Sequence, residues 1–314
     1  MGKKHVWVGV AAVPLLVGLT ACGGAATGGN AAEGNGTVTV AGVEISKDEK
    51  LAEMVPEEFR SGVKALTIAP YPPYMEIGPG GEVEGALIDV GDAVAAKLGV
   101  TIDYSPVNLD GAIPALQAGK GDLLVMTLAD TAEREKVLDF INFGKDGLSL
   151  MVKAGNPEGI ESGKDLCGKN VTILSGWSPA DTFDVISEQC ESEGRQAVNI
   201  LRLPKTEDGL MAVKSGNASA SYVSKSAALT AVKELGENAG IEVILPKDEP
   251  AGWNHQYKGL TLPKGSELEA PIEEAMRHLL EDGTLKQIFD EYEVGYILND
   301  EIIVNEALAL SNLW

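Results

Sequence analysis

The chain has 314 residues, of which 47 are acidic and 25 are basic, and its formal net charge is −22. A surface that binds nucleic acid needs a basic footprint, so this charge excludes that class of function. The length is enough for one large or two ordinary domains with a real hydrophobic core. We interpret the acidity as a contribution to solubility; the alternative is recognition of a cationic partner.

The first 21 residues have the three parts of a secretory signal peptide. Lys3, Lys4 and His5 precede the apolar run 6–19, and small residues follow before Cys22. The run has about 14 residues, fewer than the roughly 20 that a helix needs to span a bilayer. Cys22 ends the segment Leu-Thr-Ala-Cys, which resembles the lipobox of bacterial lipoproteins. The alternative is an ordinary secreted protein with a chance cysteine.

The lipobox resemblance implies that residues 1–21 are removed and that Cys22 carries lipid at the new N-terminus. Two or more acyl chains hold a protein firmly at a membrane, whereas a single chain binds it marginally. Residues 22–37 are rich in Gly, Ala, Asn and Thr, so we expect a flexible linker there. The expected location is therefore extracytoplasmic, with a lipid anchor in the outer face of the cell membrane.

The two remaining cysteines, Cys167 and Cys190, are predicted to form a disulfide. Outside the cytoplasm, an even pair of cysteines favours a bridge over free thiols. The pair flanks an expected strand at 171–174 and an expected helix at 180–188, so a hairpin-like return would bring the sulfurs together. A metal site is not expected, because the two sulfurs lack nearby histidines.

Strand and helix patterns alternate along the rest of the chain, which indicates an α/β architecture. A first set has strands at 65–69, 100–104 and 123–127 and helices at 88–98, 110–118 and 131–137. A second set has strands at 171–174, 200–203 and 220–223 and helices at 180–188 and 208–214, and further helices are expected at 267–280 and 285–292. Asp110 is expected to cap its helix, with Pro114 in the first turn, where N–H groups have no helical partner.

An approximate internal repeat indicates two similar lobes. Residues 110–125 and 207–222, offset by 97 positions, share an acidic start, a short helix pattern, a glycine and a strand. Ligand crevices in open α/β sheets lie beyond the carboxyl ends of the strands, so two facing lobes would form a cleft. Segments 139–153 and 253–262 are expected to connect the lobes. Lobe 1 is predicted to comprise 38–147 and 254–314, and lobe 2 to comprise 148–253.

Seven short motifs point to a known family through their order and spacing. They are Tyr71-Pro-Pro-Tyr74, Gly85–Asp89, Asp110–Gly119, Asp130–Arg134, Val137–Phe140, Leu166–Lys169 and Glu281–Thr284. Residues 66–294 thereby resemble the type II extracytoplasmic solute-binding proteins of polar amino-acid ABC importers. The paired cysteines and Gly155-Asn-Pro157 are similar to the actinobacterial branch of that family. The resemblance implies an α/β, periplasmic-binding-protein type II fold, with two lobes joined by two hinge crossovers.

The resemblance also implies ligand contacts from lobe 1. Arg134 matches the arginine that clamps the ligand carboxylate, and a guanidinium suits this task because it binds a carboxylate bidentately. The alternative is a surface residue paired with Glu133. Thr127 and Ala129 match contact positions in the loop after the strand that ends at Met126, with Ala129 contributing only its backbone N–H. Tyr71 matches the aromatic residue that packs against the ligand.

Further implications concern the core, a helix start and the lobe 2 loop. Tyr74 is expected in the core, and the spacing of Asp130 and Glu133 is typical of a capping box. Trp177 and Ser178 match the loop that brings backbone N–H groups to the ligand carboxylate. Ser178 also has the position of an N-cap before the helix at 180–188, so capping alone is an alternative.

Two positions depart from the family pattern. Ser224 lies where family members carry the acidic residue that binds the ligand ammonium, and Leu109 replaces a second aromatic residue. Either the alignment slips by a residue or the pocket accepts something other than a simple α-amino acid. The alternatives are an amino acid held by Asp181 or Glu76, a betaine-like or amidated compound, and a small acid.

The function implied by the resemblance is that of a lipid-anchored protein that captures a small polar solute and delivers it to an ABC transporter permease. It implies no enzymatic activity, cofactor or metal, no nucleic-acid partner, and a monomer. One alternative is an enzyme on the same fold, of the dehydratase or cell-wall lytic type. A second is a sensory binding lipoprotein without a permease. After residue 21 only His255 and His278 remain, and we find no P-loop, nucleophile or metal motif.

Overall fold

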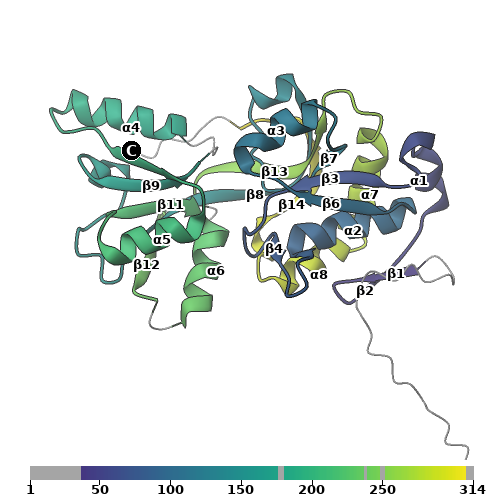
Figure 1. Ribbon diagram of the computed structural model, residues 1–314, viewed down its shortest axis with the longest axis horizontal. Coiled ribbons are helices and arrows are strands. Elements are labelled where there is room, and N and C mark those ends of the chain that lie inside the picture. Colours follow the sequence, from purple (N-terminus) through teal and green to yellow (C-terminus); the bar gives the residue numbers. More distant parts are fainter. Residues whose placement is uncertain (1–36, 176–179, 237–238, 248–251, 309–314) are drawn as a thin grey trace, which may run out of the picture. The chain divides into compact units, whose positions relative to one another are not determined.

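The computed structural model describes residues 37–175, 180–236, 239–247 and 252–308, with the side chains of 180–182 left out (Figure 1). The predicted signal peptide, Cys22 and nearly all of the predicted linker lie outside these residues. The described residues all belong to one compact unit. Among the described residues, no helix combines the length and the apolar character needed to cross a membrane.

The first lobe is built on three parallel strands with helical crossovers. Strand β3 pairs with β6 on one side and with β7 on the other, and β7 then meets β13 in antiparallel orientation. The bounds are β3 Val63–Thr67, α2 Ala86–Leu98, β6 Ile102–Pro106, α3 Leu109–Gln117 and β7 Leu123–Leu124. Helix α2 ends as predicted at Gly99, which adopts the left-handed conformation (φ 68°).

The second lobe repeats this arrangement. Strand β9 pairs in parallel with β10 and β11, and β11 meets β8 in antiparallel orientation. The bounds are β9 Asn170–Leu174, α4 Ala180–Ser192, β10 Asn199–Leu203, α5 Thr206–Ser215, β11 Ala220–Ser224, α6 Lys225–Leu235 and β12 Ile241–Ile244. Leu109 and Thr206, the first residues of α3 and α5, are 97 positions apart, as are the first residues of β7 and β11. The predicted similarity of the two lobes is therefore confirmed.

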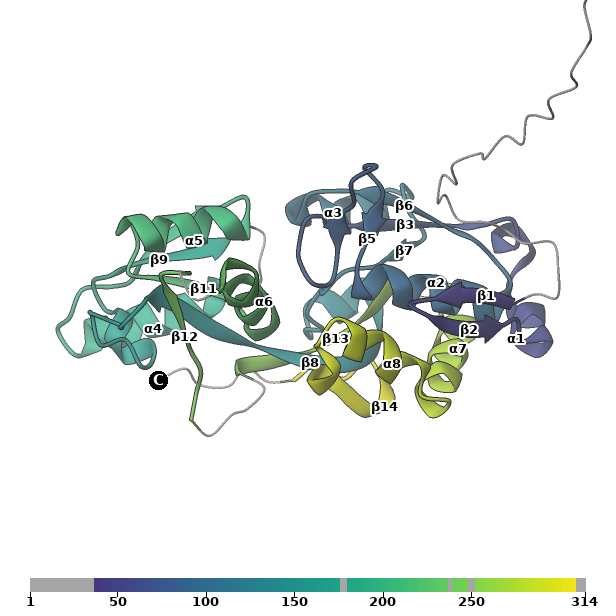
Figure 2. The same cartoon turned by 90° about the horizontal axis from the view of Figure 1, so that it is seen from below.

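Two long antiparallel strands pass between the lobes (Figures 1 and 2). They are β8, Leu138–Lys153, and β13, Trp253–Pro263. Both coincide with the segments predicted as connections, and β8 pairs with β13 near one lobe and with β11 and β12 in the other. The exact lobe boundaries at 147/148 and 253/254 remain a prediction. The two lobes have separate hydrophobic cores, because Phe140 and Phe143 belong to one cluster and Phe183 and Tyr222 to another.

The C-terminal part returns to the first lobe. It comprises α7 Glu269–Glu281, α8 Thr284–Glu291, the 3-10 turn η5 Gly295–Ile297 and β14 Leu298–Val304. Helices α7 and α8 fall where the sequence predicts them. Strand β14 pairs with β8 opposite β13, so β8 has neighbours on both edges at Gly144. This strand was not expected from the sequence.

Several local predictions are wrong. Helix α3 begins at Leu109 after the N-cap Asn108, so Asp110 is not the cap and Pro114 lies in the helix interior rather than in its first turn. The expected helix at 131–137 is only the 3-10 turn η2, Arg134–Lys136, because β8 begins at Leu138. Asp130 does not form a capping box there, since its Oδ2 accepts a hydrogen bond from Asn142 Nδ2 at 2.7 Å.

An N-terminal extension precedes the first lobe. Strands β1, Thr37–Val40, and β2, Val43–Ser46, form a hairpin, and α1, Glu49–Met54, follows it. Ala41 and Gly42 at the hairpin turn both have positive φ, the geometry of a two-residue type I′ turn. Smaller elements are β4 Glu76–Ile77, β5 Val83–Glu84 and the 3-10 turns η1 Glu57–Phe59 and η3 Gly163–Leu166.

The predicted disulfide is present. Cys167 and Cys190 are bridged with a Cα–Cα distance of 5.6 Å, which lies inside the normal range for a disulfide. The bridge ties the turn after η3 to helix α4, and Cys190 is fully buried in the core of the second lobe.

Candidate functional site

A cavity of about 630 Å³ lies at the carboxyl ends of the parallel strands of both lobes. The first lobe contributes residues 68–71 after β3 and residues 107–111 at the start of α3. The second lobe contributes Leu174 and Ser175 at the end of β9 and residues 204–206 at the start of α5. This is the position at which open α/β sheets bind ligands. Two of the predicted ligand residues, Tyr71 and Leu109, line this cavity.

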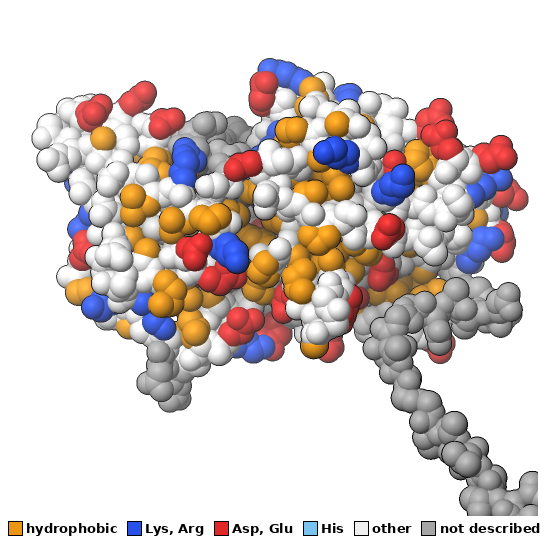
Figure 3. All heavy atoms as spheres, in the orientation of Figure 1, with side chains coloured by type: hydrophobic (Ala, Val, Ile, Leu, Met, Phe, Trp, Pro, Cys, Tyr) orange, Lys and Arg blue, Asp and Glu red, His pale blue; other side chains and the backbone are white. Residues whose placement is uncertain are grey.

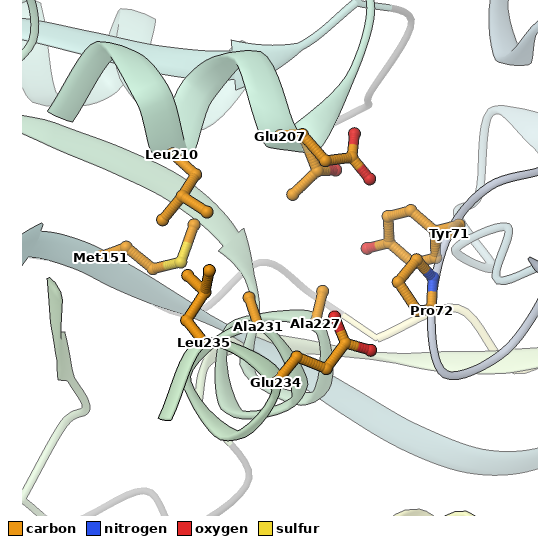
Figure 4. Close-up of a pocket in the computed structure, with 10 residues that line it drawn as sticks. Tyr71, Pro72, Met151, Glu207, Leu210, Ala227, Ala231, Glu234 and Leu235 are labelled. Atoms are coloured by element: carbon orange, nitrogen blue, oxygen red, sulfur yellow. The ribbon is translucent and has the colours of Figure 1, made fainter. Parts of the chain in front are cut away.

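A smaller cavity of about 160 Å³ adjoins the first, and the two share Tyr71 and Thr206. Figure 4 shows its apolar floor and the acidic side chains of Glu207 and Glu234 beside it. The apolar lining is formed by Met151, Leu210, Ala227, Ala231 and Leu235. In the space-filling view, apolar side chains gather over α5 and α6 on this face (Figure 3). An aliphatic group with a cationic end would fit this combination of surfaces.

Tyr71 and Ser224, both predicted to contact ligand, are hydrogen-bonded to each other. The Tyr71 hydroxyl donates to Ser224 Oγ at 3.0 Å, and both side chains are buried. Figure 4 shows the hydroxyl pointing towards helix α6. Ser224 is the N-cap of α6, and its Oγ also accepts from the backbone N–H of Ala227 at 3.2 Å. This contact joins the two lobes at the edge of the cavity.

The contact continues to a buried carboxylate on β8. Ser224 Oγ lies 3.0 Å from Ser226 Oγ, and Ser226 donates to Asp146 Oδ2. The Tyr74 hydroxyl donates to the same oxygen at 3.3 Å. Asp146 is 2% exposed. Burial raises its pKa, while the bonds from Ser226 and Tyr74 and the charge of Lys258 act in the opposite direction.

Arg134 lies in turn η2 and is half-buried. Its Nη1 donates to the carbonyl oxygen of Ala129 at 2.8 Å, and its backbone N–H lies 3.3 Å from Thr131 Oγ1. The alternative pairing with Glu133 is not found, because Glu133 forms an ion pair with Lys136. Burial lowers the pKa of Arg134 to about 10, and the nearby charge of Asp130 opposes this decrease. The side chain is therefore cationic at neutral pH, and among the described residues Ala129 is the acceptor given for its guanidinium.

A second cation lies beside Arg134. Lys258 on β13 is 5% exposed and pairs with Ala129 in an isolated antiparallel bridge. Burial lowers the pKa of Lys258 to about 8; Asp146 raises it and Arg134 lowers it further. Lys258 is therefore largely protonated at pH 7. Thus Lys258 and Asp146, on the two strands that connect the lobes, are both buried and interact electrostatically.

The remaining predicted residues are distributed as follows. Thr127 is half-buried and Ala129 is buried, both in the loop that precedes η2. Trp177 and Ser178 lie outside the described residues, as does the side chain of Asp181. Glu76 lines a different cavity of about 440 Å³, together with Ser226, and is not among the residues that line the main cavity.

Asp146, Ser226 and Lys258 were not singled out in the sequence. Asp146 and Lys258 are charged residues inside the two segments predicted as connections, and a charge within such an apolar run is the signal that was available. Among the described residues, no three His, Cys, Asp or Glu side chains are grouped as ligands for a metal ion.

Comparison with known proteins places this arrangement in a family. The pattern of the bacterial extracellular solute-binding proteins, family 3, matches residues 63–295, which include both lobes and both connecting strands. The chain belongs to this family. Its two-lobed α/β architecture is the periplasmic-binding-protein type II fold.

Curated relatives in the family align over most of their length. The arginine-binding protein ArgT of Corynebacterium glutamicum is 27% identical over 263 residues, which cover 82% of this chain and 83% of ArgT. The L-cystine-binding protein TcyJ of Escherichia coli K12 is 25% identical and the alignment covers 81% and 90%. The L-arginine-binding protein of Pseudomonas aeruginosa is 26% identical, with coverage of 74% and 86%.

Solved structures agree with these relatives. An ancestral arginine-binding protein bound to arginine is 30% identical, with a TM-score of 0.64 over 74% of this chain and 97% of the other. The ancestral amino-acid-binding protein AncCDT-1, described as a precursor of cyclohexadienyl dehydratase, is 26% identical, with a TM-score of 0.62 and coverage of 77% and 98%. The chain is thus similar to binding proteins over nearly the whole of their length.

Proposed function

We propose that this protein is a lipid-anchored solute-binding protein that captures an amino acid, or a closely related solute with a carboxylate, and delivers it to an ABC transporter permease. The observation that carries the proposal is the family match across residues 63–295, which spans both lobes and both connections. The relatives named above as arginine- and cystine-binding proteins support an amino acid as the class of ligand.

The charges of the site support a carboxylate as the part of the ligand that is held. Arg134 presents guanidinium donors close to the buried Lys258. Two cations in a partly desolvated site attract an anion more strongly than two exposed ones, because the effective dielectric constant is lower. In this proposal Thr127, Ala129, Trp177 and Ser178 contribute the remaining contacts to the carboxylate, and Tyr71 and Leu109 contact the rest of the ligand.

A thermal-shift screen of L-amino acids, betaines and small dicarboxylates tests this proposal. A solute that binds only the native state raises the melting temperature by mass action. We expect at least one amino acid to do so and to bind with micromolar affinity or better, which corresponds to about −8 kcal/mol. An unchanged melting temperature for all solutes would contradict the proposed function.

The Arg134→Ala variant tests the carboxylate clamp. Loss of a charge-assisted bidentate contact costs about 1.5–3 kcal/mol, so we expect affinity for the solute found in the screen to fall roughly 10- to 100-fold. Glu133→Ala, at the exposed neighbouring position, is the control and should bind as the wild type does. Unchanged affinity of Arg134→Ala, measured by calorimetry, would remove the clamp from the proposal.

The anchor and the partner belong to the same proposal. Lipid on Cys22 would keep the binding protein at the outer face of the membrane, where an exported solute receptor meets its permease. We expect Cys22→Ser to release the protein from the membrane fraction into the medium without a change in ligand affinity. Retention of that variant in the membrane fraction would contradict a lipid anchor. We further propose that the protein belongs to the actinobacterial branch of the family and that it is a monomer. Light scattering on the purified chain would test the monomer.

An enzyme on this fold is the second candidate function, and the similarity to AncCDT-1 is the observation that favours it. We propose binding without turnover, because a transporter must receive its solute unchanged. Incubation of the protein with the solute found in the screen, followed by mass spectrometry, separates the two. A product that accumulates in proportion to the protein would assign an enzyme.

A sensory lipoprotein would bind the solute equally well but would not support its uptake in cells.

A further inference from the structure

The direction of every hydrogen bond around Ser224 can be assigned. Ser226 has a single hydroxyl hydrogen and donates it to Asp146 Oδ2, so it can only accept from Ser224. Ser224 therefore gives its own hydrogen to Ser226. Its remaining acceptor sites take the hydroxyl hydrogen of Tyr71 and the backbone N–H of Ala227. Each hydroxyl in the chain Tyr71–Ser224–Ser226 thus donates towards Asp146.

This polarity leaves the Tyr71 hydroxyl oxygen as an acceptor at the cavity, in addition to the carboxylates of Glu207 and Glu234 that line its smaller part. Ser224 has no acceptor site left, because its two lone-pair positions are occupied. Tyr71 has committed its only hydrogen, so its Oη offers lone pairs, and Tyr71 lines both adjoining cavities. Hydrogen-bonded chains polarise one another, so a negative charge at one end strengthens the acceptor at the other. The cavity therefore meets an electron-rich phenolic oxygen that is hydrogen-bonded to Ser224, the position at which the family resemblance predicts an acidic residue.

The charge at the far end is held in place. Asp146 is almost completely buried, and its Oδ1 has no hydrogen-bond partner among the described residues. Lys258 on the neighbouring strand interacts with it electrostatically and favours the ionised form. The Tyr74 hydroxyl supplies a further bond to Oδ2. A buried carboxylate that is incompletely paired in this way is costly, which indicates a function for it beyond packing.

We propose that Asp146, through the hydrogen-bonded chain of Ser226, Ser224 and Tyr71, is an anionic group by which this site recognises the ammonium of its ligand, whereas Glu207 and Glu234 lie at the smaller cavity. The Tyr71 hydroxyl oxygen accepts the ligand N–H, and Asp146 is the positioning residue that makes it an effective acceptor. The inference rests on the proposed binding function and identifies the ligand as one that carries an ammonium as well as a carboxylate. It resolves how serine at position 224 is compatible with an amino-acid ligand.

The test compares ligands with and without the ammonium. L-arginine and 5-guanidinopentanoate differ only in the α-ammonium, as do L-glutamine and 4-carbamoylbutanoate. Calorimetry on the wild type should show that the amino member of at least one pair binds tighter than its partner. Asp146→Asn should reduce the affinity for the amino member about tenfold or more, because the charge that acts on the ammonium over a chain of three hydrogen bonds is removed. It should leave the affinity for the partner unchanged, because the partner has no ammonium.

Two further variants and a control make the test specific. Tyr71→Phe removes the acceptor, and Ser226→Ala interrupts the chain without removing the charge, so both should lose the same preference. Ser226→Ala decides the matter if Asp146→Asn fails to fold. The control is Asp92→Asn on α2, where the carboxylate also accepts from a tyrosine hydroxyl, that of Tyr104 at 2.9 Å. It should keep the wild-type preference.

The contrary outcomes are distinct from failure of the binding function. Equal losses for both members of a pair in Asp146→Asn would show a purely structural role and overturn the inference. So would binding of a solute from the screen that lacks an ammonium while neither amino acid binds; the proposed solute capture would then stand. Absence of binding by every solute tested would overturn both.

Discussion

A single carboxylate, Asp139, holds the start of β8 to two other segments. Its Oδ1 accepts from Lys264 Nζ at 2.6 Å and from Asn305 Nδ2 at 2.8 Å, and its Oδ2 accepts from the backbone N–H of Gly265 at 2.6 Å. Burial acts to raise the pKa of Asp139, but these hydrogen bonds together hold it below its usual value. The ionised form is therefore favoured in the folded protein.

The sign of the pH dependence follows from this depressed pKa. The stabilisation is fully present above the unfolded-state pKa of 3.8 and is lost as the pH falls through the lower folded-state pKa. We expect Asp139→Asn to lower the free energy of unfolding by about 1–3 kcal/mol at pH 7, since Lys264 is half-exposed and regains water. Urea denaturation from pH 2.5 to 7 should show the two curves converging at the acid end. If the stability curves of the wild type and Asp139→Asn stayed parallel over this pH range, the proposed role of Asp139 would be contradicted. The control is Asp103→Asn at an exposed position, which should follow the wild-type curve.

Individual site residues were predictable only in part. Tyr71, Leu109, Arg134 and Ser224 come from the family pattern, and the first two line the main cavity. Asp146 could not be assigned, because its hydroxyl partner Ser226 is 80 positions away and only the folded sheet brings them together. The hydrogen-bond polarity that follows from this contact has no signal in the local sequence.

At the scale of the elements, glycines on β8 and α3 offer a matched pair of substitutions. A Cβ on Gly144 would meet the carbonyl oxygen of Ile297 and lie 3.0 Å from its carbon, whereas a Cβ on Gly111 would have no atom within 4 Å. We expect Gly144→Ala to destabilise the protein by about 1–3 kcal/mol because backbone must shift. Gly111→Ala, inside helix α3, should stabilise it by about 0.5–1 kcal/mol.

Thermal unfolding of the two variants checks this prediction. The expected result is a lower melting temperature for Gly144→Ala and an equal or higher one for Gly111→Ala. An undiminished melting temperature for Gly144→Ala would mean that η5 does not lie against β8 as described. Because both changes add one methyl group to a glycine, differences in hydrophobicity do not explain opposite signs.

The C-terminal strand is a second element with a testable role. Ile302 of β14 is 3% exposed, and Asn305 Oδ1 accepts from the backbone N–H of Phe140 at 2.9 Å. The backbone N–H of Ala307 donates to Glu135 in η2 at 2.9 Å, beside Arg134. The segment 298–307 therefore stabilises both the edge of β8 and the turn that carries the proposed carboxylate clamp.

Truncation tests this role. Removal of 298–314 should lower the free energy of unfolding by at least about 2 kcal/mol, from the lost burial of Ile302 alone. It should also weaken ligand binding, because η2 loses its contact with Ala307. Removal of only 309–314 is the comparison, so that the difference belongs to 298–308. Equal stability and equal affinity for the two truncated chains would contradict the role.

The elements were predicted better than their ends. Helices α2, α7 and α8 and the repeat of α3 with α5 follow from hydrophobic spacing and terminal glycines. Helix α6 was missed, although Ser224 before it and Gly236 after it are ordinary end signals. Segment 139–153 was predicted as a connection and not as one continuous strand. Gly144, Asp146 and Gly147 interrupt its apolar pattern, and pairing on both edges explains why β8 continues through them.

For the whole molecule, the two connecting strands make closure of the lobes the expected response to ligand. A conformational equilibrium moves from 1:99 to 99:1 only if the ligand favours one state by about 5.5 kcal/mol. A micromolar solute binds with about 8 kcal/mol in total. For a shift of that size, most of the binding energy would come from contacts that exist only when both lobes are engaged, such as Arg134 from one lobe together with the Ser224 region of the other.

Small-angle scattering tests this closure. Saturation with the solute that raises the melting temperature should decrease the radius of gyration of the chain 37–308 by a few per cent. Arg134→Ala at the same fractional saturation should close less, because it removes a contact that favours the closed state, whereas Glu133→Ala should close as the wild type does. An unchanged radius at full saturation would contradict closure of the lobes on ligand binding. Transport would then require a different signal to the permease than the approach of two lobes.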